Sequence, residues 1–119
     1  MFNHKYFVYI LTNYKKSVLY VGVTNNLERR LTEHYSNRGS DNSFAGKYYC
    51  FYLLYYESFK YINNAIEREK EIKGWSRKKK ENLIKKENPN LDFMNSGIMT
   101  WPPSEKIVFL GSFGANTSG

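Results

Sequence analysis

Four side chains in the first part of the chain carry groups that could do chemistry: Tyr9, Tyr20, Arg30 and His34. A guanidinium is a fixed positive charge with several N–H donors, a histidine titrates near neutral pH, and a tyrosine can line a site or stack on a base. Each also has a structural explanation. Tyrosines pair across strands, an arginine lays its stem on a core, and a histidine on an apolar face is often a core residue. Residue type alone leaves both explanations open.

Arg30 and His34 interrupt the apolar face of a helix predicted over residues 27–34. Asparagines that can cap a helix precede it. Leu27, Arg30, Leu31 and His34 follow the spacing i, i+3, i+4 and i+7, so they share one face. The pattern therefore predicts two polar groups directed toward the sheet.

Glu69 is a carboxylate inside the apolar stripe of a second helix, predicted over residues 59–75. The residues that share this stripe are Ile62, Ala65, Ile66, Glu69 and Ile72. An unpaired buried carboxylate is strongly destabilising, so Glu69 needs a cation or strong donors. Two partners are equally consistent with the sequence: Arg30 in an internal ion pair, or a hard metal ion such as Mg²⁺ or Mn²⁺.

The two tyrosines are expected on adjacent antiparallel strands over residues 5–11 and 18–23. Both stretches are rich in β-branched and aromatic residues, and a polar connection of hairpin length joins them. Side chains alternate along a strand, so Tyr9 and Tyr20 can approach the same side of the sheet. Gly22 is expected to leave room for another backbone or for a ligand phosphate.

The rest of the chain completes a small α/β fold. A loop is expected over 37–46, a third strand, buried on both faces, over 48–56, and a basic helix over 77–86. The order β-β-α-β-α-α predicts a small three-stranded, mainly antiparallel sheet flanked by helices. We expect this domain to span residues 1–96, and residues 97–119 to form a neutral, loosely attached tail.

The charge of the chain favours a polyanionic partner, since 119 residues carry a formal net charge of +7. The basic run Arg77, Lys78, Lys79 and Lys80 is predicted to hold backbone phosphates. The alternative is a solvated helix face. Phosphate contacts give affinity without sequence choice, so we expect weak, salt-sensitive, structure-selective binding.

The remaining composition favours a soluble, cytoplasmic protein. Cys50 is the single cysteine, which forms no internal disulfide and suits a reducing compartment. No apolar run is long enough to span a membrane, and the N-terminal residues lack the features of a signal peptide.

The segments around these residues resemble the signature of the GIY-YIG nucleases, in particular the small single-domain bacterial branch, also called URI-domain proteins. The resemblance covers roughly residues 5–91, and the segments that carry it are Val8-Tyr9-Ile10, Tyr20-Val21-Gly22, residues 26–31 with His34, and residues 68–77. Phe7 stands where the family has glycine and Val21 where it has isoleucine. Neither difference removes a reacting group.

This resemblance implies a metal-dependent endonuclease that hydrolyses DNA phosphodiester bonds, in repair or recombination, with Mg²⁺ or Mn²⁺. It implies that Tyr9 and Tyr20 position or deprotonate the attacking water. Arg30 then matches the arginine that binds the scissile phosphate, His34 a nearby histidine, and Glu69 the glutamate that binds the metal.

Several alternatives stay open at this point. The base is either Tyr9, which needs cations nearby because its ordinary pKa is near 10, or His34. The late asparagine of the family corresponds to Asn88 or Asn90. The rival function is a non-catalytic nucleic-acid-binding module with an internal Arg30–Glu69 pair. RNA as the substrate and an unidentified protein partner also remain open.

Overall fold

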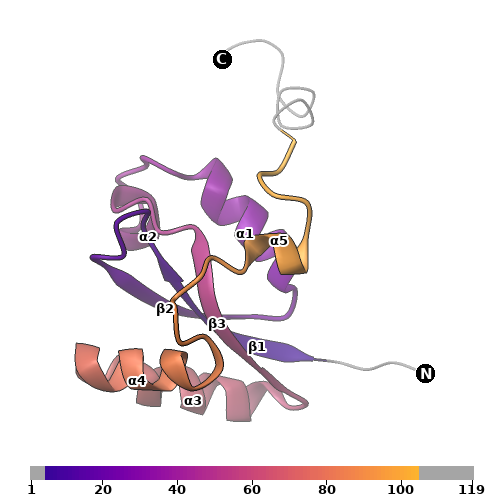
Figure 1. The fold of residues 1–119 in the computed structure, drawn as a ribbon. Coiled ribbons are helices and arrows are strands. Elements are labelled where there is room, and N and C mark those ends of the chain that lie inside the picture. The colour runs from indigo at the N-terminus through magenta and orange to yellow at the C-terminus, as the bar shows by residue number, and fades with distance from the viewer. Residues whose placement is uncertain (1–4, 105–119) are drawn as a thin grey trace.

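The chain folds into a three-stranded antiparallel sheet with helices on both faces (Figure 1). The computed structural model describes residues 5–104. The elements follow in the order β1 (Tyr6–Thr12), β2 (Leu19–Thr24), α1 (Leu27–Ser36), α2 (Phe44–Lys47), β3 (Tyr52–Phe59), α3 (Ile62–Lys73), α4 (Arg77–Glu87) and α5 (Asn95–Ile98). The spatial order of the strands is β2-β1-β3. This confirms the predicted fold class and adds two short helices, α2 and α5.

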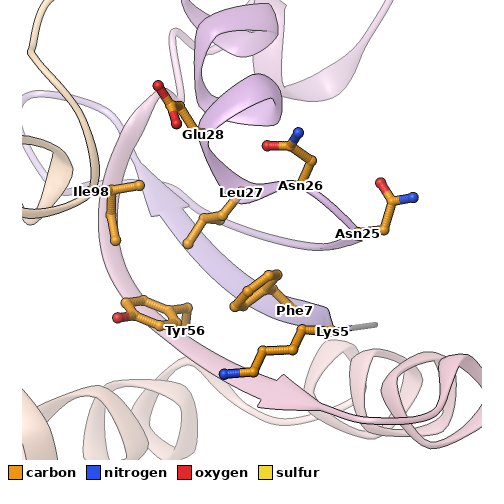
Figure 2. Close-up of a pocket in the computed structure, with 8 residues that line it drawn as sticks. All are labelled: Lys5, Phe7, Asn25, Asn26, Leu27, Glu28, Tyr56 and Ile98. Carbon is orange, nitrogen blue, oxygen red and sulfur yellow. The ribbon is translucent and has the colours of Figure 1, made fainter. Parts of the chain in front are cut away.

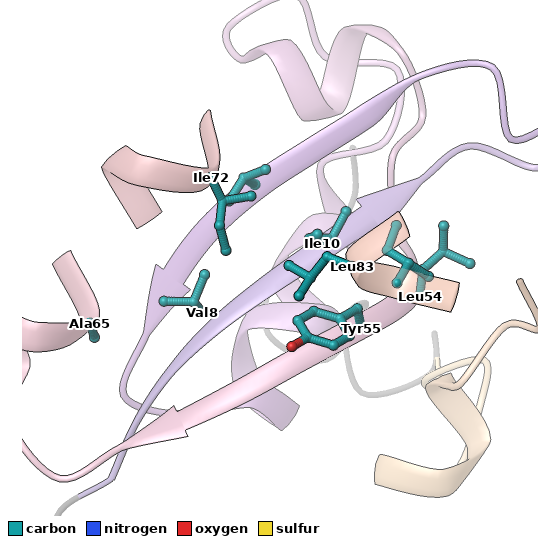
Figure 3. Packing of buried hydrophobic residues seen from close by; sticks show 9 residues of the cluster. Val8, Ile10, Leu54, Tyr55, Ala65, Ile72 and Leu83 are labelled. Atoms are coloured by element: carbon teal, nitrogen blue, oxygen red, sulfur yellow. The ribbon is translucent and has the colours of Figure 1, made fainter. Parts of the chain in front are cut away.

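The central strand β1 divides the core into two layers, because its side chains alternate between the faces of the sheet. Val8 and Ile10 point into a cluster with residues of α3 and α4 (Figure 3). Tyr9 and Leu11 point into the opposite cluster, which contains Leu31 of α1. In Figure 1, α1 and α5 therefore lie on one side of the sheet and α3 and α4 on the other.

The segment before β3 differs from its prediction. The third strand was expected from residue 48, but Phe44–Lys47 is a helix, capped by the Ser43 hydroxyl, and the strand begins at Tyr52. Tyr49 has a φ of 57°, in the left-handed region that interrupts an extended strand. β3 is also an edge strand, so only its first half is buried.

An ion pair ties α3 to β3. Arg68 donates from Nε and Nη2 to both carboxylate oxygens of Glu57, at 2.9 and 2.8 Å. The Tyr55 hydroxyl donates to the same carboxylate at 2.6 Å. A two-point contact of this kind fixes direction as well as distance. It sets the position of α3, and thereby of Glu69.

Packed residues continue from Asn95, at the end of the predicted domain, into the start of the predicted loose tail at residue 97. Asn95 is buried, accepts a hydrogen bond from the Leu53 amide at 2.7 Å and donates one to the Phe51 carbonyl at 2.9 Å. After it, Ile98, Met99 and Trp101 pack on the cluster around Leu31. The chain is therefore not loosely attached at these positions, and residues 105–119 lie outside the described part of the chain. Within residues 5–104, no helix has the length and apolar character needed to cross a membrane.

Candidate active site

Tyr9 lies at the centre of a polar cluster beneath α1. Its side chain is fully buried, and its hydroxyl oxygen lies 2.8 Å from Nε2 of His34. Arg30 donates from Nε to the same oxygen at 3.3 Å. The Tyr20 ring centroid lies 6.3 Å from that of Tyr9 and 5.4 Å from that of His34. The structure thus brings together the four residues singled out in the first part of the sequence.

Helix α1 presents Arg30 and His34 to the sheet because its apolar residues bury the same face. Leu27 and Leu31 are buried, and the Asn26 side chain accepts a hydrogen bond from the Arg29 amide at the start of the helix. The cap fixes the first turn, so each residue that follows has a set direction. The spacing predicted for this helix is the observed one.

Gly22 makes room for Tyr9. The two residues are partners across β1 and β2, and a Cβ built on Gly22 would lie 2.5 Å from both Cζ and the hydroxyl oxygen of Tyr9. The space that the sequence suggested for a ligand phosphate is therefore occupied by the phenol ring. The role of Gly22 is therefore to leave space for the Tyr9 ring.

The change Gly22→Ala is expected to push the Tyr9 ring away from Arg30 and His34. Overpacking of this kind typically costs about 1–3 kcal/mol of folding free energy. Urea denaturation measures this loss. Gly97→Ala is the matched control, because a Cβ at Gly97 would meet no atom within 4 Å. Equal stability of the two variants would contradict the close approach of Tyr9.

Burial keeps both Tyr9 and His34 uncharged at neutral pH. Loss of hydration raises the pKa of Tyr9 to about 12, although the hydrogen bond from Arg30 opposes the rise. Loss of hydration, helped by the positive charge of Arg30, lowers the pKa of His34 to about 4. Because Arg30 donates to the phenol oxygen, the phenol proton can point at Nε2 of His34 in the tautomer that carries its proton on Nδ1.

The lowered pKa of His34 predicts acid destabilisation between about pH 6.5 and pH 4. In this window the unfolded chain binds a proton at the histidine and the folded chain does not, so stability falls as pH falls. We expect a loss of about 2 kcal/mol, reduced from the full linkage value because the ring is partly exposed. Thermal melting across this range measures it.

The variant His34→Gln is the control for this effect, since it keeps an acceptor for Tyr9 but does not titrate. Its stability should change much less between pH 6.5 and pH 5, where most carboxylates remain ionised. Parallel pH profiles for the two proteins would contradict the assignment to His34.

Glu69 lies on α3, in the layer opposite to the polar cluster. Its side chain is 13% exposed, and its Oε2 lies 2.6 Å from Nζ of Lys73, one turn further along the helix. Arg30 instead pairs with Glu33 at 3.2 Å. The internal Arg30–Glu69 pair considered from the sequence is therefore wrong. Periodicity placed Glu69 correctly in a half-buried position but could not identify its partner.

The donor set around Glu69 limits how a metal could be held. Between residues 5 and 104 no three His, Cys, Asp or Glu side chains gather in a way that could bind a metal ion. A metal at Glu69 would have one protein carboxylate, with waters as its other ligands. Mg²⁺ accepts such a shell, because it retains several waters and prefers oxygen donors.

The residues of the basic run on α4 differ in how firmly the fold holds their side chains. Arg77 donates to the carbonyls of Ser17 and Lys16 at 2.8 and 2.6 Å, and to Glu81 at 2.8 Å, so it is an anchor for the β1–β2 turn. Arg77 therefore has an internal role, and its contact with a backbone phosphate stays a prediction.

Lys78 is exposed, Lys79 lies with Nζ 4.4 Å from the Trp75 ring centroid, and Lys80 is half-buried beside the β1–β2 turn. All three belong to α4, on the layer opposite to Tyr9.

The two asparagines that could correspond to the late asparagine of the family differ in burial. Asn88 is buried and donates to the carbonyls of Leu54 and Asp92, whereas Asn90 is exposed.

A pocket of about 440 Å³ adjoins the cluster along β1, and sequence reasoning did not identify it. Its lining residues are Lys5, Phe7, Asn25, Asn26, Leu27, Glu28, Tyr56 and Ile98 (Figure 2). Tyr56 is the partner of Tyr9 across β1 and β3. The alternation of side chains along β1 predicts that Phe7 and Tyr9 share a face of the sheet. That Tyr56 lines the same pocket follows only from the pairing of β1 with β3.

Comparison with known proteins gives consistent matches. Residues 5–82 match the model of the GIY-YIG catalytic domain. A UPF0213 protein of Bacillus pumilus is 36% identical over 84 residues, which cover 71% of this chain and 83% of that protein. A UPF0213 protein of Haloquadratum walsbyi is 36% identical over 81 residues, covering 68% of this chain and 88% of that protein.

A solved structure also matches. The solution NMR structure of the UPF0213 protein BH0048 from Bacillus halodurans is 28% identical, with a TM-score of 0.48. The match covers 81% of this chain and 99% of that one.

Proposed function

The chain belongs to the GIY-YIG catalytic-domain family, a nuclease superfamily, and from this premise we propose that it is a divalent-metal-dependent endonuclease that hydrolyses DNA phosphodiester bonds. The observation that carries the proposal is the contact of one buried phenol with both a guanidinium and a histidine. These are the groups needed to hold a phosphate and to accept a proton from water. We place this activity in DNA repair or recombination in the cytoplasm.

Arg30 is the proposed phosphate-binding residue. Its Nε is committed to Tyr9 and its Nη1 to Glu33, while the side chain remains 40% exposed. A phosphate can therefore reach the guanidinium from solvent. The N–H donors of Nη1 and Nη2 that these two contacts leave over would stabilise the charge that builds on the phosphate oxygens as the bond to water forms.

The proton route runs through Tyr9 to His34. The water oxygen bonds to phosphorus while its proton passes to the Tyr9 hydroxyl, which gives its own proton to Nε2 of His34. The bond from phosphorus to the leaving sugar oxygen breaks, and that oxygen takes a proton from solvent. The geometry supports the pair over either residue alone, because the Tyr9 hydroxyl lies 2.8 Å from Nε2 of His34 and can pass on one proton as it receives another.

Glu69 is the proposed metal-binding residue. Mg²⁺ or Mn²⁺ bound there would supply Lewis acidity to a phosphate oxygen. Helix α3 and the Tyr9 cluster lie on opposite layers, so Glu69 would hold the ion apart from the residues that contact Tyr9. Lys73 already neutralises the carboxylate, so a metal ion has to compete with this ion pair.

Gel assays of the purified protein test the proposal. Supercoiled, branched and single-stranded DNA and a matching RNA are incubated with Mg²⁺, with Mn²⁺ or with EDTA. We expect nicks in DNA that require the metal and disappear with Tyr9→Phe, which keeps the ring but has no hydroxyl. Binding without cleavage under every condition would favour a non-catalytic nucleic-acid-binding module instead.

A further inference from the structure

Next to Tyr20 the molecule exposes aromatic rings that its core does not bury. Phe44 is 51% exposed, Tyr48 41%, Tyr49 53% and Tyr14 73%. We call these four residues the aromatic platform. Exposed apolar side chains that gather on one surface mark sites of interaction.

The aromatic platform is continuous with the polar cluster. The Phe44 ring stacks on that of Tyr20, with centroids 6.4 Å apart and an interplanar angle of 21°. The Tyr48 ring follows at 4.8 Å from Phe44. Tyr48, Tyr49 and Tyr14 then line a pocket of about 300 Å³. A path of rings thus runs outward from the residues proposed to act on the phosphate.

Lysines accompany these rings. The Nζ of Lys47 lies 5.5 Å from the centroid of Tyr48, and Lys15 lines the same pocket as Tyr14. Neither residues 13–18 nor residues 43–49, which carry the platform, contain an Asp or a Glu. The surface therefore combines flat π-faces with positive charge.

We propose that the aromatic platform binds unpaired nucleotides of a strand whose backbone continues from the phosphate at Arg30. Bases stack on aromatic rings whatever their sequence, and neighbouring lysines hold the backbone. A duplex hides the faces of its bases, so the platform selects single-stranded segments. The position of the scissile phosphate rests on the proposed function, but the binding itself does not require catalysis.

Fluorescence anisotropy in EDTA tests this binding. The probes are a labelled oligothymidylate, a DNA duplex of equal length and an oligouridylate. Phe44→Ala and Tyr48→Ala are each expected to weaken binding of the oligothymidylate by about fivefold or more, with little change for the duplex. An equal loss with the oligouridylate would show that the platform reads bases without regard to the sugar.

Two control variants separate stacking from general effects. Tyr61 is 60% exposed and has Lys60 5.6 Å from its ring, but it precedes α3 on the other layer, so Tyr61→Ala should bind normally. Phe44→Leu keeps an apolar side chain without a π-face and should bind nearly as weakly as Phe44→Ala. Unchanged thermal melting would confirm that each variant is folded.

The binding and cleavage results together distinguish failure of the aromatic platform from failure of the nuclease function. No binding of the oligothymidylate by the wild type, equal affinities of Phe44→Ala and Tyr61→Ala, or full binding by Phe44→Leu would each overturn the platform. If these results came with metal-dependent cleavage by the wild type, the proposed nuclease function would stand without the platform. If the platform variants lost binding and the wild type cleaved no substrate, the platform would stand and the nuclease function would fail.

Discussion

Replacement of Arg30 by alanine is expected to lower the rate of DNA cleavage by about 10³-fold, the scale seen when an arginine that stabilises transferring phosphoryl charge is removed. The ion pair with Glu33 is partly exposed and spans one helical turn, so its loss should cost about 0.5 kcal/mol, and loss of the hydrogen bond to the buried Tyr9 hydroxyl about 1 kcal/mol more. Single-turnover rates with Mg²⁺, measured beside thermal melting, separate the two effects.

Arg29→Ala is the matched control for this variant. Arg29 neighbours Arg30, pairs with the same Glu33 at 3.5 Å and carries the same charge, but it is directed to solvent and to Asn25. The Arg29→Ala variant should lose only the nonspecific electrostatic attraction of one positive charge to DNA. Arg30→Lys should recover part of the rate, since a lysine keeps the charge without the planar fork. Equal rates for Arg29→Ala and Arg30→Ala would contradict a specific role for Arg30.

The variant Glu69→Gln is expected to lower metal-dependent cleavage by about 10²-fold or more, since a bound metal contributes several kcal/mol of charge stabilisation. The amide keeps the shape of the side chain but loses its negative charge. Calorimetric titration with Mn²⁺ measures the affinity for the metal ion, which does not depend on cleavage activity. We expect weaker Mn²⁺ binding by Glu69→Gln than by the wild type.

Two further variants sharpen this test. Glu67→Gln removes an exposed carboxylate two residues away and should leave Mn²⁺ binding unchanged. Lys73→Gln removes the ammonium that lies 2.6 Å from Glu69, so it should strengthen Mn²⁺ binding by about two- to fivefold, the scale of a surface ion pair. Identical Mn²⁺ titrations for Glu69→Gln and Glu67→Gln would assign the metal to some other group.

The arrangement of the cluster explains why both Tyr9 and His34 were candidates for the base. From the sequence the two are alternatives, since the ordinary pKa of Tyr9 is near 10 and that of His34 near 6.5. In the fold they share a hydrogen bond of 2.8 Å, and burial shifts the pKa of each away from neutrality in opposite directions. Their chemistry is therefore a property of the pair.

Local pattern was sufficient for the elements that carry the cluster. The two-residue period of β1 predicted that Tyr9 and Leu11 share a face, and the helical period of α1 predicted the same for Arg30 and His34. These relations need only the geometry of one strand or one helix. The prediction of the third strand failed at Tyr49. The left-handed φ of this residue prevents an extended backbone there, so the strand begins only at Tyr52.

Contacts between distant segments were decided only by the tertiary structure. Arg77 belonged to a basic run, but the β1–β2 turn supplies carbonyls that fix its guanidinium. Gly22 was expected to face a ligand, but strand register sets it against Tyr9. Neither partner is encoded in the spacing around the residue.

The sequence by itself determined which side chains of β1 and α1 face the core, and together with the family resemblance it grouped Tyr9, Tyr20, Arg30 and His34. The tertiary structure decided which of them touch, and placed Glu69 with Lys73 on the opposite layer. The physical reason is that periodicity fixes the direction of a side chain relative to its own backbone. Its partner, charge and access to solvent depend on how separate elements pack together.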